Sequence, residues 1–114
     1  LRIRGIYGEE AVGRIESILE FVGLSHKKDQ NALTLSSGES QRAAIARALV
    51  IDPEILFLDE PTASIDEKNT ESIENIIRQL KDHGRTTVIM TTHERAQAER
   101  LADRVLLLEN GRIV

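Results

Sequence analysis

The sequence has no cysteine, few aromatic side chains and no long apolar run. Without thiols the chain can form neither a disulfide nor a zinc site of the thiolate kind. Aromatic residues make up 3% of the 114 residues, so a core must be built from isoleucine, leucine, valine and alanine. The longest apolar stretches, at 55–58 and 105–108, have the length of strands, whereas a membrane-spanning helix needs ~20 residues.

An excess of positive charge is also missing. Lysine and arginine number 15 against 19 aspartate and glutamate, and the formal net charge of −4 argues against a broad nucleic-acid-binding surface. At this length the sequence provides for one domain at most. No secretory signal opens it, and its first residue is Leu1 rather than methionine, which indicates a fragment.

Periodic apolar residues predict helices and strands in alternation. The expected helices run over 9–22, over 37–50, from a cap at Asp66 to a stop at Gly84, and over 94–102, and the expected strands over 55–59, 86–91 and 104–108. This order predicts an α/β fold with a parallel sheet and right-handed crossovers. Because 55–59 is apolar throughout, we expect this strand to be covered on both faces. Asn110 and Gly111 predict a tight turn and a hairpin return over 112–114.

A small polar turn, formed by Ser36, Ser37 and Gly38, precedes the helix expected over 37–50. Ser36 and Glu39 have the spacing of a capping box, in which each side chain satisfies the backbone N–H of the other. The free N–H groups and the dipole of such a helix start attract an anion, and Gly38 would let a phosphate approach the backbone closely. A plain capped helix is the alternative.

Two carboxylates, Asp59 and Glu60, end the first predicted strand. Ligands of an open parallel sheet lie beyond the carboxyl ends of its strands. There, one carboxylate can hold Mg²⁺ through water and the next can polarise an attacking water. His93 follows the strand 86–91 at the same sheet edge, where it can donate a hydrogen bond to a phosphate oxygen. The alternatives are a solvated acidic turn and an ordinary surface histidine.

Other charged residues receive no functional assignment. Arg42 and Arg47 lie on the helix 37–50 and can bind a phosphate or a partner, but arginines on a helix usually form a solvated or ion-paired face. Glu74 and Arg78 have the spacing of an ordinary surface pair.

Together these motifs resemble the C-terminal half of an ABC transporter nucleotide-binding subunit. The matching segments are 35–39 for the signature motif, 55–60 for the Walker B strand and its adjoining base, Ser64, Ile65 and Asp66 for the D-loop, and His93 for the switch histidine. Motifs in this order are far more specific than any one of them. Ser37 and Glu39 depart from the family pattern, which usually has glycine and glutamine at these positions.

The resemblance implies a partial P-loop NTPase (RecA-like) parallel sheet joined to an ABC helical subdomain. Residues 1–50 would belong to the helical subdomain, including the signature helix, and residues 51–114 would form the C-terminal half of the RecA-like core. The phosphate-binding loop G-x-x-x-x-G-K-[ST] and its strand are absent from the sequence. That strand normally lies between the strands 86–91 and 104–108, so we expect a gap in the sheet whose edges invite exchange of segments between chains.

The resemblance also implies how the site residues divide between two subunits that face head to tail. Each ATP would lie between the phosphate loop of one subunit and the signature of the other. Asp59 would hold Mg²⁺ through water, Glu60 would activate the hydrolytic water and His93 would contact the γ-phosphate of its own subunit's ATP. The partner's ATP would be contacted by Ser36, Ser37, Gly38 and Glu39. Asp66 would lie at the dimer interface.

The leading hypothesis is a fragment of an ABC transporter ATPase subunit, which couples ATP hydrolysis to solute transport. Residues 1–5 resemble the corresponding segment of importers. The expected partners are a second nucleotide-binding subunit, transmembrane permease subunits and a solute-binding protein, on the cytoplasmic face of the membrane, with no nucleic acid. Without the phosphate loop, the chain alone is expected to be inactive. The alternatives are a non-transport ABC ATPase, such as a DNA-repair or translation factor, and a non-catalytic interaction module.

Overall fold

The computed structural model describes residues 8–25 and 35–114 of the chain. Its elements are, in order, α1 (Gly8–Phe21), α2 (Ser37–Leu49), β1 (Ile55–Asp59), α3 (Glu67–His83), β2 (Thr87–Thr91), α4 (Arg95–Leu101), β3 (Leu108–Glu109) and β4 (Arg112–Ile113). The four predicted helices and the first two predicted strands are confirmed to within a residue at each end. The importer-like segment 1–5 lies outside the described residues.

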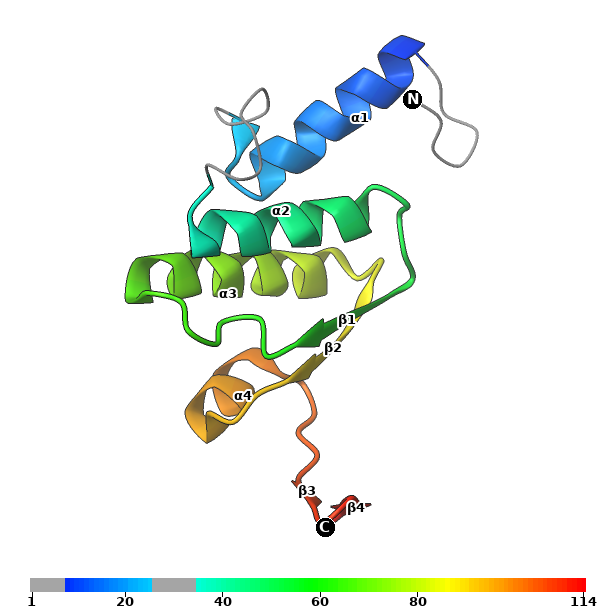
Figure 1. The fold of residues 1–114 in the computed structure, drawn as a ribbon. Coiled ribbons are helices and arrows are strands. Elements are labelled where there is room, and N and C mark those ends of the chain that lie inside the picture. The colour runs from blue at the N-terminus through cyan, green and yellow to red at the C-terminus, as the bar shows by residue number, and fades with distance from the viewer. Residues whose placement is uncertain (1–7, 26–34) are drawn as a thin grey trace.

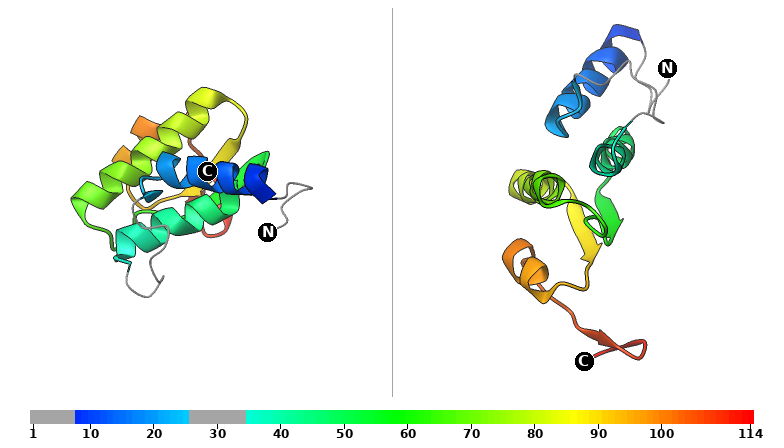
Figure 2. Two further views of the ribbon diagram at one scale, coloured as in Figure 1. Left: turned by 90° about the horizontal axis from the view of Figure 1, so that it is seen from above. Right: turned by 60° about the vertical axis from the view of Figure 1, so that its left-hand side comes forward.

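The helices are stacked on one side of the two long strands. α2 and α3 lie side by side, α1 lies over them, and α4 lies beside α3 (Figure 1). In the right-hand view of Figure 2, the other side of β1 and β2 carries no element of the described chain. None of the helices within 8–25 and 35–114 is long and apolar enough to cross a membrane.

Short-range hydrogen bonds explain where α2 and α3 begin and end. Ser36 Oγ accepts a hydrogen bond from Glu39 N at 3.1 Å, and Ser36 N donates to Glu39 Oε1 at 3.0 Å, so the predicted capping box is confirmed. Asp66 caps α3 by accepting from Asn69 N. Gly84 ends α3 with a φ of 69°, a left-handed conformation that glycine adopts without a steric penalty.

β1 and β2 form a parallel pair in which Asp59 lies opposite Thr91. Along β1 the side chains alternate between two very different environments. Leu56 and Leu58 are buried, but Phe57 between them is 60% exposed. The expectation that this strand is covered on both faces is therefore wrong for the described chain, because all the helices lie on the same side of the sheet.

The hydrophobic core joins this covered sheet face to the helices above it. It consists of Val22, Leu24, Ile45, Ala46, Leu49, Leu56, Leu58, Ile73, Ile76, Ile77, Leu80 and Leu101. All are aliphatic, as the scarcity of aromatic residues predicts. The core draws most heavily on α3, whose apolar stripe packs against β2.

The expected third parallel strand, 104–108, is not part of the β1–β2 sheet. Residues 105–107 join no parallel strand of the described chain, and the Leu107 carbonyl accepts a hydrogen bond from Val114 N at 2.9 Å beside the hairpin. Strand residues need a neighbouring backbone for their N–H and C=O groups, and no described strand lies between β2 and this segment. The local hairpin is confirmed: β3 and β4 pair antiparallel across Asn110 and Gly111, both with positive φ. The observed fold is thus mixed α/β with a short parallel sheet.

Candidate functional site

The carboxyl ends of β1 and β2 bring the predicted acidic pair and the predicted histidine together. His93 Nε2 lies 2.6 Å from Glu60 Oε1. The side chain of His93 is 92% exposed and that of Glu60 is 37% exposed, so the contact is accessible from solvent. The juxtaposition that strand order predicts is confirmed, while the chemical role of each residue stays a prediction.

Thr91, the last residue of β2, holds both carboxylate residues in place. Its hydroxyl donates to Asp59 Oδ1 at 2.5 Å. The same hydroxyl oxygen accepts from Glu60 N at 3.0 Å, and so does the Thr91 carbonyl oxygen at 3.0 Å. The sequence reasoning missed this residue, although a threonine that ends the strand next to Asp59 is a signal that could have suggested it.

The backbone of Glu60 is in an unusual conformation. Its φ is 46°, which an L-residue adopts at a cost of roughly 1–2 kcal/mol. Such a conformation persists only where the surroundings hold it, and it occurs preferentially at functional sites. Here Thr91 holds the Glu60 N–H, and the fully buried Pro61 follows directly.

The donor set beside Glu60 suits Mg²⁺ only with help from other ligands. The described residues contain no group of three or more histidine, cysteine, aspartate or glutamate side chains that could hold a metal ion. In phosphate-transfer sites, however, Mg²⁺ is bound by one or two carboxylates together with phosphate oxygens and water. Asp59, exposed and oriented by Thr91, fits this requirement as the single protein carboxylate.

The start of α2 is a capped helix end that is packed tightly against α3. The Glu39 carboxylate is turned back onto the backbone of the capping residue, where its Oε1 accepts a hydrogen bond from Ser36 N. Gly38 is buried, and a Cβ on it would lie 2.2 Å from Cγ of Asn69. Gly38 is therefore required by the contact between α2 and α3, in addition to any approach of a phosphate.

Asn69 connects the predicted D-loop to the signature helix. Its Nδ2 donates to Asp66 Oδ1 at 2.6 Å, and this hydrogen bond lowers the pKa of the Asp66 carboxyl. Its Oδ1 accepts from Arg42 Nη2 at 3.2 Å, and Arg42 Nη1 donates to the Val22 carbonyl at 3.1 Å. Arg42 thus joins α2 to α3 and to the end of α1. The position of Asp66 at a dimer interface stays a prediction.

Comparison with known proteins identifies the family. The sequence profile of the ABC transporter family matches residues 3–63, which is more than half of the chain. The chain belongs to the ABC transporter family. Over 113 residues it is 44% identical to the arginine transport ATP-binding protein ArtP of Escherichia coli K12, covering 99% of this chain and 46% of ArtP.

Two further relatives agree with this assignment. The methionine import ATP-binding protein MetN 1 of Acinetobacter baylyi is 39% identical over 114 residues, covering 100% of this chain and 32% of that protein. The crystal structure of MJ1267, an ATP-binding cassette of an ABC transporter in its ADP conformation, matches with a TM-score of 0.83 and 32% identity, over 96% of this chain and 42% of that one. This ABC transporter chain therefore spans less than half the length of these relatives.

One acidic residue of the ABC transporter chain is misjudged by sequence reasoning. Glu74, expected in a surface pair with Arg78, is only 4% exposed. Arg100 of α4 donates to both of its carboxylate oxygens, at 3.0 Å from Nε and 2.6 Å from Nη2, and this interaction lowers the pKa of Glu74. Arg78 lies farther away, with Nη2 3.5 Å from Glu74 Oε1. The predicted pair with Arg78 is therefore present, but the surface location predicted for Glu74 is wrong because α4 covers this part of α3.

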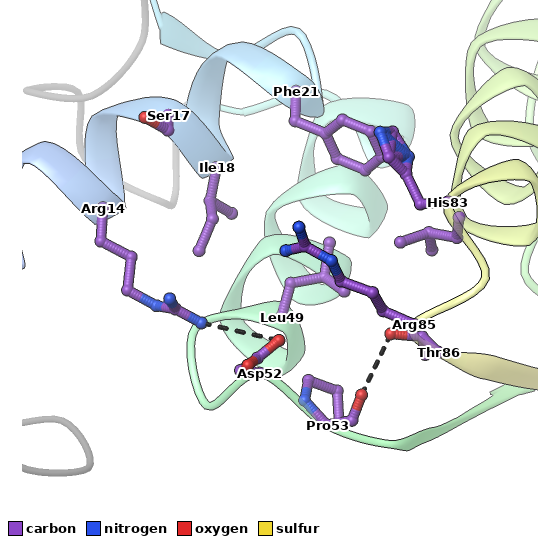
Figure 3. A pocket seen from close by; sticks show the side chains of 11 residues that line it. Arg14, Ser17, Ile18, Phe21, Leu49, Asp52, Pro53, His83, Arg85 and Thr86 are labelled. Atoms are coloured by element: carbon purple, nitrogen blue, oxygen red, sulfur yellow. Dashed lines mark hydrogen bonds and ion pairs between the residues drawn. The ribbon is translucent and has the colours of Figure 1, made fainter.

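A pocket of about 270 Å³ lies away from these residues. Arg14 and Asp52 approach each other on one side of it, with Nη2 and Oδ1 3.9 Å apart, and Thr86 donates to the Pro53 carbonyl at 3.0 Å below it (Figure 3). Because Pro53 and Thr86 precede β1 and β2, the pocket lies at the amino ends of the strands. Glu60 and His93 lie at the carboxyl ends, so this pocket is not the predicted nucleotide site.

Proposed function

We propose that this chain provides the signature, Walker B, D-loop and switch histidine of an ATPase subunit that drives solute import through a membrane transporter. The observation that carries the proposal is the 2.6 Å contact between Glu60 Oε1 and His93 Nε2, next to Asp59, at the carboxyl ends of two parallel strands. Ligands of open α/β sheets bind beyond this edge. The name of MetN 1 supports import, and the names of ArtP and MetN 1 both suggest an amino acid as the solute.

In the proposed mechanism Glu60 acts as the general base and accepts a proton from the attacking water. His93 holds the Glu60 carboxylate through Nε2–H in the state described, and would donate to a γ-phosphate oxygen when nucleotide is bound. Asp59 would hold Mg²⁺ through water, and the ion would neutralise part of the phosphate charge when bound. Thr91 keeps the Asp59 carboxylate oriented for this contact.

The signature residues are proposed to act on the ATP of a second, head-to-tail subunit. Ser36, Ser37, Gly38 and Glu39 lie at the start of α2, where the helix dipole and the backbone N–H groups favour an anion. Asp66 would lie at the interface between the two subunits. Residues 1–50 are assigned to the helical subdomain and 51–114 to the ATPase core.

The proposed setting is a transporter complex at the cytoplasmic face of a membrane. Permease subunits and a solute-binding protein would be the other partners, and the chain would be attached to the membrane only through them. The transport setting is supported by the names of the relatives, and the partners are those that the family resemblance implies.

The test uses a hybrid cassette, in which the N-terminal part of ArtP that precedes the matching region is joined to this chain. We expect Mg²⁺-dependent ATP hydrolysis, and we expect Glu60→Gln to lower kcat by about 10²–10⁴-fold while ATP still binds, because the amide cannot accept the proton. Glu94→Gln is the matched control, since this exposed carboxylate follows His93 but lies outside the proposed site.

A kcat for Glu60→Gln within about twofold of the parent would remove Glu60 as the base. A folded hybrid that binds no ATP would favour the non-catalytic module, one of the alternatives from the sequence. The 114-residue chain alone should show no turnover.

A further inference from the structure

A buried polar chain runs from α3 through α4 to the turn that follows β1. Its central residue is Gln97 of α4, which is 1% exposed. Gln97 Nε2 donates to Glu74 Oε2 at 2.9 Å and to Thr62 Oγ1 at 2.8 Å. At the far end, the two hydrogen bonds from Arg100 fix the Glu74 carboxylate. These hydrogen-bonded side chains therefore tie the position of Thr62 to α3 and α4.

The hydrogen bonds to Glu74 and Thr62 require an amide side chain at position 97. An ionised carboxylate only accepts hydrogen bonds, so Gln97 must turn its NH₂ group toward Glu74. The two hydrogens of that group then serve Glu74 and Thr62. This orientation leaves Gln97 Oε1 buried without a hydrogen-bond partner in the described part of the chain, which is unfavourable. Leucine would fill the same space without burying an unpaired oxygen. The amide therefore indicates that Gln97 serves to position Thr62.

These buried polar side chains fix the position of Glu60. Thr62 is two residues beyond Glu60, Pro61 between them is buried, and Ala63 N donates to the Glu60 carbonyl at 3.1 Å. The left-handed backbone of Glu60 is thus held on one side by Thr91 of β2 and on the other by this turn. We propose that Thr62 and Gln97 are positioning residues that hold Glu60 in place for the proposed ATPase reaction. The role of these residues in catalysis rests on the proposed function, whereas the restraint that they place on the Glu60 backbone does not.

The structural part is tested by hydrogen exchange in the 114-residue chain. Thr62→Val removes the hydroxyl at nearly constant shape, Thr62→Ser keeps it, and Arg78→Gln alters a neighbour of Glu74 that does not reach the turn. We expect the amides of Glu60 and Ala63 to exchange about 10-fold faster in Thr62→Val and at the parental rate in the other two variants.

Equal exchange rates of the Glu60 and Ala63 amides in Thr62→Val and in the parent, whether both are slow or both are fast, would overturn the inference.

The catalytic part is tested in the hybrid cassette. Thr62→Val should lower kcat about 10-fold and leave the KM for ATP within about twofold, because a displaced base slows the chemical step more than it weakens binding. Thr62→Ser should restore kcat. Slow turnover in both variants would overturn the inference, because the hydroxyl would then not be the important group.

The outcomes separate this inference from the proposed function. Failure of Glu60→Gln to affect the hybrid would reject the function, while the exchange rates still decide whether the polar chain positions Glu60. Normal kcat in Thr62→Val together with a strong effect of Glu60→Gln would reject only the positioning role.

Discussion

The two faces of the β1–β2 sheet are built from similar residues but have opposite environments. On the face toward the helices, Leu56 and Leu58 are 5% and 7% exposed. On the other face, Ile55, Phe57 and Ile89 are 63%, 60% and 46% exposed. An apolar strand of this kind is typical of a sheet covered on both sides, and the described chain supplies one cover only. A contiguous exposed apolar face marks a surface that binds another polypeptide segment or promotes aggregation.

The largest expected effect on stability comes from truncating a buried side chain on the sheet face that packs against the helices. Leu58→Ala should lower the free energy of unfolding of the chain by about 2–5 kcal/mol, because it removes a buried side chain from β1 and leaves a cavity beneath the helices. Urea unfolding followed by circular dichroism measures this difference. A loss below about 1 kcal/mol would mean that the helix layer does not pack on this face as described.

An intermediate effect is expected from the polar part of the covered side, where α4 lies on α3. Because hydrogen bonds from Arg100 lower the pKa of Glu74 below its ordinary value of 4.5, they stabilise the fold at pH values above 4.5. This contribution is lost as the pH falls through the lowered pKa. Glu74→Gln should therefore reduce the free energy of unfolding by about 1–3 kcal/mol at pH 7 and by progressively less in acid.

The control for this experiment is Glu71→Gln on the same helix. Glu71 is exposed, so its removal should leave the stability nearly unchanged at every pH. Parallel pH profiles for the parent and Glu74→Gln would contradict the role of the Arg100 contact.

The smallest effect is expected on the bare face. In the isolated chain, Phe57→Ser should change the free energy of unfolding by no more than about 0.5 kcal/mol, because Phe57 is mostly exposed. Self-association, measured by sedimentation velocity, should decrease. In the hybrid cassette the same substitution should lower stability by about 3–5 kcal/mol if the added segment covers this face. An equally small effect in both proteins would show that the added segment does not cover this face.

Sequence patterns were sufficient for the four helices, the first two strands and the cluster at the sheet edge. The capping box of Ser36 and Glu39 depends on residues three apart, so it could be read directly. The approach of Glu60 and His93 could be predicted because the carboxyl ends of parallel neighbours meet at one edge. The strand expected at 104–108 could not be judged in the same way, because a strand depends on a neighbour as well as on its own residues.

By itself, the sequence determined the helices, their caps, the first two strands and the order of the motifs, because these follow from contacts between residues close together in the chain. Only the tertiary structure decided that Glu74 is buried beneath α4, that Gly38 packs against Asn69, and that no described element covers one face of the sheet. Each of these depends on which segments, distant in the sequence, come to lie against each other. The physical reason is that burial and hydrogen-bond partnership belong to the neighbours that a residue acquires on folding.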